Sequence, residues 1–380
     1  MSPLHHSTTA PPHHHCTTDP RTVLTLDAGG TNFVFNAVRA NEEIVLPVSI
    51  TASGRSLETI LKNIIRGFEE VKSQLTKEPA AISFAFPGPA DYVNGIIGDL
   101  QNLPLFRGGV ALGPMLEEHF RIPVYINNDG DLFAYGEAIA GLLPEVNQKL
   151  EESGNPKQYH NLLGVTFGTG FGGGIVSRGE LFLGDNSAGG EINRTRNRTF
   201  KNYDAEESVS IRGVRREYAN YAGINLRSCP EPKEIFEIGM GTRKGNRDAA
   251  KSAFHAFAVV AGDALANAST LVDGLIAIGG GLSNAYPLFL NDLVAEMNQP
   301  FNTLSGESLD RLEVKTFDLE DPGQRQEFYH ADTLHTAVPF TNREVIYHPV
   351  KKIGVGISRL GTSRAVSIGA YAFALHALNQ

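Results

Sequence analysis

The residue types that can hold a phosphate and its metal ion are gathered in Asp27-Ala28-Gly29-Gly30-Thr31-Asn32. Apolar runs on both sides predict strand, tight turn, strand over residues 22–38. Adjacent glycines let the backbone bend and approach a ligand closely, because neither carries a Cβ. Backbone N–H groups and the Thr31 hydroxyl can donate to a phosphate, and the Asp27 carboxylate attracts a cation. An ordinary glycine hairpin explains this stretch equally well, so complementary residues elsewhere must decide.

A second glycine cluster, GTGFGGG, lies at residues 168–174. Its first, third and sixth residues fit the dinucleotide pattern G-x-G-x-x-G, but a dinucleotide site needs a helix directly after the glycines. Residues 175–182 instead predict strand, turn, strand, which excludes that site. What remains is a second glycine hairpin, with Thr169 placed as Thr31 is in the first. Two such loops, about 140 residues apart, imply two similar halves that close on one nucleotide.

Polar side chains crowd the end of the buried strand predicted at 122–126, in the order Asn127-Asn128-Asp129-Gly130-Asp131. A helical pattern over 132–143 follows, so helix capping is the simplest explanation. One cap needs only one residue, however, and open α/β folds bind ligands at the carboxyl ends of their strands. We therefore favour a polar-ligand site here over capping alone.

Two later stretches have the composition of ligand contacts. Glu191 follows Gly189-Gly190 and can point into a cleft, whereas the basic run 193–198 is interpreted by default as a solvated charge cluster. Gly279-Gly280-Gly281 joins a buried strand at 275–278 to a predicted helix from residue 282. Bare backbone suits contact with a nucleobase or sugar, and a closely packed turn is the alternative.

The elements that position these residues follow from the spacing of the apolar residues. The spacing predicts a buried strand at 80–86 and helices at 57–75, 110–120, 206–222, 231–238 and 247–272. Residues 354–378 are glycine-punctuated and then helical. Residues 143–161 are expected to form a polar surface excursion, and the polar, irregular stretch 299–352 receives no assignment.

The composition of the 380-residue chain is that of an ordinary soluble globular protein, with 41% hydrophobic and 20% charged residues. Its length predicts two or three domain-sized units. The 42 acids and 33 bases leave a net charge of −9, which argues against a nucleic-acid surface. No uninterrupted run of roughly 20 apolar residues is present, so no membrane span is expected.

Cysteine usage indicates a reducing cytoplasm. Cys16 and Cys229 lie far apart, without the paired spacing of a zinc site, and do not form a disulfide framework. Residues 1–20 lack the order of a signal peptide and are expected to be a disordered tail. Its metal-binding side chains are interpreted as adventitious: His5, His6, His13, His14, His15 and Cys16.

The sequence lacks the P-loop, protein-kinase, H-E-x-x-H and G-x-S-x-G patterns, which excludes those enzyme classes. The motifs that are present, taken in order, resemble the ROK sugar kinases of the actin-like ATPase superfamily. They are Asp27 to Thr31, Pro87-Gly88, Asn102-Leu103-Pro104, Asn128-Asp129, 168–174, Gly190-Glu191 and Gly279 to Gly281. The resemblance covers residues 22–290 and the C-terminal helix, and its joint occurrence in order is specific.

The resemblance implies an α/β protein with two actin-like ATPase (ribonuclease H-like) domains that flank a central cleft holding ATP and sugar. The N-terminal domain is expected at 21–135, with the first phosphate loop and the sugar site. The C-terminal domain is expected at 136–365, with the second phosphate loop and the adenosine site. Residues 366–380 are expected to form a helix that packs back towards the N-terminal domain, and a homodimer is implied.

The resemblance also assigns roles by position. Asp129 matches the catalytic base, and Asn102, Asn128 and Glu191 match contacts to sugar hydroxyls. Asp27 matches a magnesium-side carboxylate. The ATP-binding positions are Asp27, Gly29, Gly30, Thr31, Asn32, Gly168, Thr169, Gly170, Gly280 and Gly281. The implied activity is ATP-dependent transfer of the γ-phosphate to a hydroxyl of a hexose or N-acetylhexosamine.

The chain departs from the family pattern after Glu191. Members with a structural zinc continue with Ile-Gly-His and a cysteine cluster, whereas here Ile192 is followed by Asn193-Arg194. No structural zinc is therefore expected. The sugar contact that the family assigns to that histidine is expected to be either lost or replaced by Arg194. A replacement by Arg194 would favour an anionic or unusually substituted sugar. The stretch 299–352 is not explained by the family pattern.

Two other functions compete with a kinase. Sugar-responsive transcriptional regulators share this fold but carry a helix-turn-helix before the first glycine loop, and only 26 residues precede Asp27. A catalytically weak or inactive sugar-binding or regulatory protein is the other alternative. The retention of Asp129 and of both glycine loops argues against it.

Overall fold

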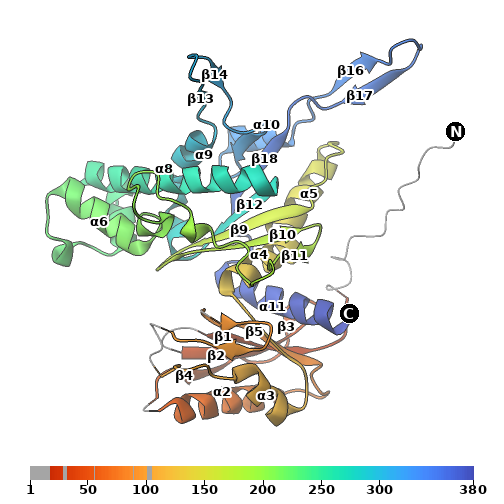
Figure 1. Cartoon of the computed structure of the whole chain (residues 1–380), viewed down its shortest axis with the longest axis vertical. Coiled ribbons are helices and arrows are strands. Elements are labelled where there is room, and N and C mark those ends of the chain that lie inside the picture. The colour runs from red at the N-terminus through yellow and green to blue at the C-terminus, as the bar shows by residue number, and fades with distance from the viewer. Residues whose placement is uncertain (1–17, 29–31, 55, 89, 101–104) are drawn as a thin grey trace. The chain divides into compact units, whose positions relative to one another are not determined.

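The computed structural model describes residues 18–28, 32–54, 56–88, 90–100 and 105–380. The chain divides into two compact units (Figure 1). Unit 1 draws on residues 1–141, 176–189 and 363–380, and unit 2 comprises 142–175 and 190–362. The last helix of the chain therefore belongs with the N-terminal residues.

The sheet of unit 1 has the strand order β3-β2-β1-β5-β8, with β4 also paired to β2. Strand β1 pairs antiparallel with β2 and parallel with β5, and β5 pairs parallel with β8. The predicted strand-turn-strand is confirmed for its two strands, as are the strands predicted at 80–86 and 122–126. The bounds are β1 Val23–Ala28, β2 Asn32–Arg39, β3 Glu42–Glu43, β4 Val48–Thr51, β5 Ala81–Ala85 and β8 Val124–Asn127. The short strands β6 (Ala90–Asp91) and β7 (Ile96–Ile97) form a separate hairpin.

Helices cover both faces of this sheet. Leu24 and Leu26 of β1 share a core with α2 (Leu57–Lys72) and α3 (Leu112–Phe120). Thr25 points to the opposite face, because side chains alternate along a strand, and its hydroxyl lies 3.3 Å from that of Ser367 in α11 (Thr362–Leu378). Helix α2 confirms the helix predicted at 57–75, although it ends three residues earlier, at Lys72.

Helix α4 (Asp129–Ala140) packs backbone to backbone against α11. A Cβ on Gly136 would overlap the carbonyl oxygen of Ala365, and one on Gly369 would overlap that of Leu132. Glycine at both positions therefore lets the two helices approach more closely than side chains would permit. This contact supports the helix that begins at Asp129.

The second large sheet has the order β11-β10-β9-β12-β18-β15, and all of it except β11 (Glu180–Leu181) and the last residues of β10 belongs to unit 2. Strands β9, β12, β18 and β15 run parallel to one another. The bounds are β9 Asn161–Phe167, β10 Phe171–Ser177, β12 Leu275–Gly279, β15 Lys315–Asp318 and β18 Lys352–Ile357. The strands expected around 175–182 and at 275–278 are confirmed.

One hydrophobic core joins β9 and β12 to a layer of helices. These are α6 (Ile211–Ala222), α7 (Pro232–Met240), α8 (Arg247–Val272) and α9 (Leu290–Met297). By length and composition α8 could cross a membrane, and it is the one helix among the described residues that could. Half of its most apolar window is buried, and it lies in this core as predicted.

Three expectations from the sequence differ from the structure. The polar excursion at 143–161 is wrong, because Leu142–Glu152 form α5, whose Leu142, Leu143, Val146 and Leu150 are buried at helical spacing. The predicted helix at 206–222 is a 3₁₀ turn at Ala205–Glu207 and then α6, which Ser210 caps. The helix expected from residue 282 is a 3₁₀ helix, Gly281–Leu288, followed by α9. Pro287 lacks the N–H that a continuous α-helix would need there.

The unassigned stretch 299–352 is regular over much of its length. It holds the β13–β14 hairpin (Phe301–Asn302 with Ser308–Leu309), β15, α10 (Pro322–Tyr329) and the start of β18. It also holds the hairpin of β16 (Leu334–Ala337) and β17 (Glu344–Tyr347). The parallel partner of β15 is β18, about 35 residues later in the chain. The periodicity of a short stretch therefore does not reveal that β15 is a strand.

Candidate functional site

Asp27 and the polar cluster after β8 lie at the same edge of the unit 1 sheet. Leu24, Ile82 and Val124 are neighbours across the parallel strands β1, β5 and β8. Three residues further along their strands lie Asp27, near the end of β1, and Asn127, at the end of β8. The carboxyl edge of the sheet therefore carries the Asp27 carboxylate beside the start of α4.

Asn128 and Asp129 both accept a hydrogen bond at the start of α4. The Gly130 N–H donates to Asn128 Oδ1 at 2.7 Å and to Asp129 Oδ1 at 3.0 Å. Capping is therefore confirmed for Asn128, and its predicted sugar contact stays a prediction. Because the cap fixes the first turn of the helix, it also fixes the backbone that carries Asp129.

The environment of Asp129 favours the neutral, protonated form of its carboxyl group over the charged form. The residue is exposed, yet the surrounding protein reduces its hydration, and this raises the pKa of the carboxyl above its ordinary value. The Gly130 N–H lowers the pKa, and the negative charge of Asp27 raises it further. A carboxylate with a raised pKa is a better proton acceptor than an ordinary surface aspartate.

Asn127 is a candidate that the sequence-based roles left out. Its side chain is 2% exposed, and its Nδ2 has no partner among the described residues. Burying an amide N–H without an acceptor costs free energy, so such a group in a native fold indicates a ligand, an ion or a water. The signal in the sequence was its place directly before Asn128 and Asp129.

Four predicted site residues lie outside the described residues: Gly29, Gly30, Thr31 and Asn102. Their roles stay predictions. Asn32 is described, and it begins β2 with an exposed side chain. Asp27, Asn128 and Asp129 are thus the predicted residues that unit 1 brings to one sheet edge, with Asn32 following the turn.

The second predicted turn joins β9 to β10. The Gly168 N–H donates to the Gly170 carbonyl at 3.0 Å, and the Gly168 carbonyl accepts from the Ile211 N–H, at the start of α6, at 2.8 Å. In the described part of the chain, the N–H groups of Thr169 and Gly170 have no protein acceptor. The turn therefore offers two backbone donors that an anion can use.

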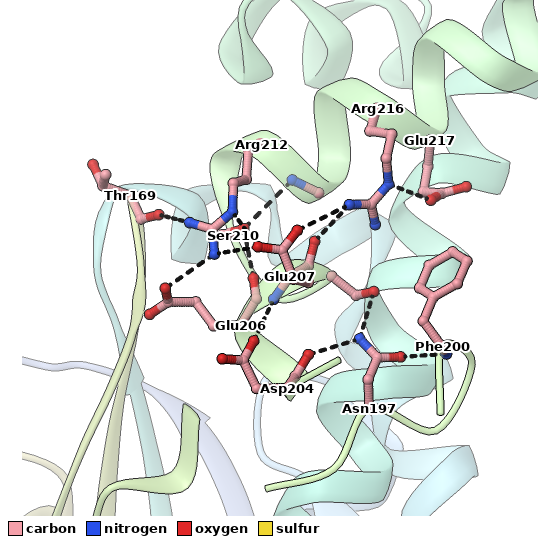
Figure 2. A network of polar contacts seen from close by, with 12 residues as sticks. Thr169, Asn197, Phe200, Asp204, Glu206, Glu207, Ser210, Arg212, Arg216 and Glu217 are labelled. Carbon is pink, nitrogen blue, oxygen red and sulfur yellow. Dashed lines mark hydrogen bonds and ion pairs between the residues drawn. The ribbon is translucent and has the colours of Figure 1, made fainter. Parts of the chain in front are cut away.

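An ion-pair network fastens this turn to α6 (Figure 2). The Phe171 N–H donates to Glu206 Oε2 at 3.1 Å, and Glu206 Oε1 lies 3.0 Å from Arg212 Nη2. Arg212 Nη1 also donates to the Thr169 carbonyl at 3.4 Å. A Cβ on Gly170 would lie 2.6 Å from Glu206 Oε2, so glycine is required for this approach.

Glu206 and Arg212 are absent from the site residues predicted from the sequence. They follow the turn by more than 30 residues and lie on another element, so no local motif joins them to it. Their charges fell within a stretch that was predicted only to be helical. Figure 2 shows that both side chains reach the turn from the start of α6 and the segment before it.

Gly280 and Gly281 follow β12, which lies directly beside β9. Gly280 has a φ of +84°, and a Cβ there would overlap the backbone of Phe167 at the end of β9. Close packing therefore explains Gly280, whereas a Cβ on the exposed Gly281 would meet open space. The two glycine segments assigned to ATP thus lie at the ends of neighbouring parallel strands in unit 2.

Glu191 is exposed and follows a close contact between backbones. Gly190, at a φ of +82°, lies against Gly174 of β10, where a Cβ would come within 3.0 Å of the Gly174 Cα. Two residues after Glu191, the Asn193 Oδ1 is buried without a partner among the described residues. Asn193 is therefore a second buried polar group that is absent from the predicted site residues.

The basic run 193–198 does not behave as one solvated cluster. The Arg194 side chain is 76% exposed, with Nη1 at 3.6 Å from Asp204 Oδ2. Arg198 instead pairs with the buried Glu296 carboxylate, which also lies 3.3 Å from Arg311 Nη1. Arg194 is thus available for a ligand, whereas Arg198 serves the structure.

The carboxylates at the sheet edge fit a magnesium ion better than a metal held by protein alone. Within the described residues, no group of three or more His, Cys, Asp or Glu side chains is arranged to hold a metal ion. Magnesium needs only one or two protein carboxylates, because phosphates and water supply its other ligands. Asp27 is suited to that role in unit 1.

Comparison with known proteins gives consistent matches. The sequence pattern of the ROK family matches residues 23–317. A glucokinase structure from Parabacteroides distasonis ATCC 8503 is 52% identical, with a TM-score of 0.85, over 95% of this chain and 99% of that chain. An N-acetyl-D-glucosamine kinase of Photobacterium profundum is 27% identical over 278 residues, which are 68% of this chain and 83% of the relative.

A more distant structure shares the fold. It is a ROK family glucokinase from Streptomyces griseus in complex with glucose and AMPPNP, at 17% identity and a TM-score of 0.59. The match covers 94% of this chain and 99% of that chain.

Proposed function

The chain belongs to the ROK family and has the actin-like ATPase fold of that family, and from this premise we propose that it is an ATP-dependent sugar kinase. The proposed reaction transfers the γ-phosphate of ATP to a hydroxyl of a hexose or N-acetylhexosamine. The observation that carries it is Asp129, placed at the first turn of α4 on the carboxyl edge of the unit 1 sheet. The glucokinase and N-acetylglucosamine kinase relatives support this substrate class.

In the proposed mechanism Asp129 accepts the proton of the attacking sugar hydroxyl. A hydroxyl is a poor nucleophile until its proton can leave, and phosphoryl transfer otherwise depends on positioning and charge stabilisation. The N–H groups of Thr169 and Gly170 donate to phosphate oxygens, and Gly280 and Gly281 face the adenosine. Asn102, Asn128 and Glu191 contact the sugar, since amide and carboxylate groups match its hydroxyls.

Magnesium is the metal that we infer, with Asp27 on its protein side. When bound, it would neutralise phosphate charge during transfer. We further infer that the enzyme has no structural zinc, that it forms a homodimer and that it works in the cytoplasm. Asp27 beside the glycine turn supports the magnesium, and the absence of the family's cysteine cluster from the sequence supports the missing zinc. The homodimer rests on the family membership, and the cytoplasm on the two widely separated cysteines.

The test is ADP release with a panel of sugars: glucose, fructose, mannose, N-acetylglucosamine, N-acetylmannosamine and allose. We expect turnover with at least one hexose or N-acetylhexosamine, in the presence of MgATP. The phosphorylated product should be identified by mass spectrometry, so that sugar-independent ATP hydrolysis is not counted. No phosphorylated sugar from any member of the panel would favour a sugar-binding or regulatory protein.

Replacing Arg194 by Ala is expected to change sugar preference and leave the KM for ATP unaltered. Its exposed pair with Asp204 contributes little, so the guanidinium can turn to a substituent on the sugar. The ratio of kcat/KM between two sugars should shift roughly 2- to 10-fold, because that is the change in affinity that the loss of one hydrogen bond produces. Arg196→Ala, two residues away and also exposed, is the matched control. An unchanged ratio of kcat/KM would mean that Arg194 is a solvated surface charge and does not contact the sugar.

Replacing Arg212 by Ala is expected to raise the KM for ATP by roughly 2- to 10-fold, with a smaller effect on kcat. The change frees the Thr169 carbonyl and one oxygen of Glu206, which together hold the donor turn. Arg216→Ala is the control, because Arg216 lies one turn later on α6 and contacts Glu207 and Glu217 instead. Equal effects of the two changes would mean that α6, not the turn, is disturbed.

A further inference from the structure

Residues 195–204 of unit 2 fold back on themselves, and we call them the closed loop. Two backbone hydrogen bonds close its base. The Ala205 N–H donates to the Thr195 carbonyl at 2.8 Å. The Asn197 N–H donates to the Tyr203 carbonyl at 2.9 Å. The two ends of the closed loop are therefore held side by side.

The closed loop joins two segments that the proposed function uses. It begins directly after Arg194, and it leads into the 3₁₀ turn Ala205–Glu207. In that turn Glu206 accepts the Phe171 N–H at 3.1 Å and so holds the Gly168–Gly170 turn. The base of the closed loop thus fixes the backbone of the proposed sugar contact beside the backbone of the residue that holds the proposed phosphate turn.

One buried amide fills the inside of the closed loop (Figure 2). The Asn197 side chain is 1% exposed, and all four hydrogen-bonding positions of its amide are used. Its Oδ1 accepts the Thr199 N–H at 3.0 Å and the Phe200 N–H at 2.9 Å. Its Nδ2 donates to the Asp204 carbonyl at 3.0 Å and to the Ser208 hydroxyl at 2.9 Å. Asn197 therefore ties the tip of the closed loop, its base and the segment before α6 to one point.

Two of these bonds lie on either side of the 3₁₀ turn that carries Glu206. Before the turn, Asp204 is held by Asn197 through its carbonyl, and its Oδ1 caps the turn by accepting the Glu207 N–H at 3.2 Å. A cap of this kind fixes the first turn of a helix. After the turn, Ser208 is held by the same amide. Loss of the Asn197 side chain would therefore loosen the turn at both of its ends.

We propose that Asn197 is a positioning residue for both substrates, which fixes Arg194 for the sugar and the Gly168–Gly170 turn for the phosphates of ATP. The inference rests on the proposed function and adds a buried residue that acts through its neighbours. A loosened segment must be ordered again when a substrate binds, and that ordering costs affinity. Loss of the amide should therefore weaken the binding of both substrates and leave the proton transfer to Asp129 unchanged.

The test compares Asn197→Ala with Asn155→Ala in the full chain. Asn155 is the matched control, because it is also buried, at 8% exposed, and its amide bonds to the backbone of Lys157 and Tyr329 instead of the closed loop. We expect Asn197→Ala to raise the KM for ATP and the KM for sugar roughly 2- to 10-fold each, with kcat within about 2-fold of the parent chain. Asn155→Ala should leave both KM values within about 2-fold.

The combination of effects identifies the positioning role. Arg194→Ala is expected to act on the sugar alone and Arg212→Ala mainly on ATP, whereas Asn197→Ala should act on both. Ser208→Ala serves if Asn197→Ala does not fold, because it removes one of the four bonds. It should raise both KM values in the same direction, by roughly 1.5- to 3-fold.

Hydrogen exchange of the backbone amides measures the positioning without turnover. Residues 168–171 and 199–207 should exchange faster in the folded variant of Asn197 or Ser208 than in the parent chain, and no faster in Asn155→Ala.

Three results would overturn the proposal. They are unchanged KM values in the folded variant of Asn197 or Ser208, equal effects of Asn155→Ala, and unchanged exchange of residues 168–171. If no sugar is phosphorylated by the parent chain, the proposed kinase activity fails, and the exchange measurement still shows whether Asn197 holds the turn. The two failures are thereby told apart.

Discussion

Replacing Asp129 by Asn is expected to lower kcat by ~10²- to 10⁴-fold while sugar binding stays nearly intact. The amide keeps the size of the side chain and an oxygen that can accept the Gly130 N–H, so the start of α4 is preserved. It cannot take the hydroxyl proton, however, and proton removal is the role proposed for this residue. Turnover is measured by ADP release, and sugar binding by calorimetry. Near-normal turnover in the variant would refute Asp129 as the base.

The pH dependence of kcat follows from the raised pKa of Asp129. A base must be ionised to act, so kcat of the parent enzyme should fall as pH drops through that raised pKa. The raised pKa also affects stability. When the pKa of a carboxyl is higher in the folded state than in the unfolded state, ionisation of that carboxyl lowers the free energy of unfolding. Asp129→Asn should therefore be at least as stable as the parent chain at neutral pH, with the difference vanishing below about pH 3.9. Lower stability at neutral pH would mean that the variant is damaged.

Replacing Gly280 by Ala is expected to reduce the free energy of unfolding by about 2–5 kcal/mol. Two effects add: the φ of +84° is costly for a residue with a side chain, and the new Cβ would overlap the backbone of Phe167. The overlap falls at the end of β9, so the change also displaces the Gly168–Gly170 turn. A urea titration of the parent chain and the variant measures the loss.

Gly281 provides the matched control for this prediction. It is the next residue, it lies outside the left-handed region, and a Cβ there would meet nothing within 4 Å. Gly281→Ala should therefore change the free energy of unfolding by no more than about 0.5 kcal/mol. If the two variants are equally destabilised, the close approach of β12 to β9 does not explain the glycine at 280.

Much of the fold could be predicted because its signals are local. Helix α8 was predicted with its observed bounds, Arg247–Val272, since apolar residues recur at helical spacing throughout it. Helix α5 was missed because polar residues such as Asn147, Gln148 and Lys149 dominate its composition and conceal the buried stripe of Leu142, Val146 and Leu150. Strand β15 was missed because its partner β18 is remote in sequence.

The candidate site divides in the same way. Asn128 and Asp129 could be found because they follow a recognisable buried strand, and parallel pairing then brings them to one edge with Asp27. Glu206 and Arg212 could not be found, because only the folded chain places them against the Gly168–Gly170 turn. Asn127 was predicted only as one member of the polar cluster, without a role, and Asn193 was missed, since only a structure shows that a polar atom is buried without a partner.

The packing of α4 against α11 has a consequence for how the protein is made. The ribosome releases the residues of α4 early and those of α11 only after all of unit 2 has been synthesised. Until then, the helix that carries Asp129 lacks the neighbour whose backbone lies against Gly136 and Gly369, and its buried face stays uncovered. Unit 1 therefore cannot complete its packing until α11 has been synthesised, after the residues of unit 2.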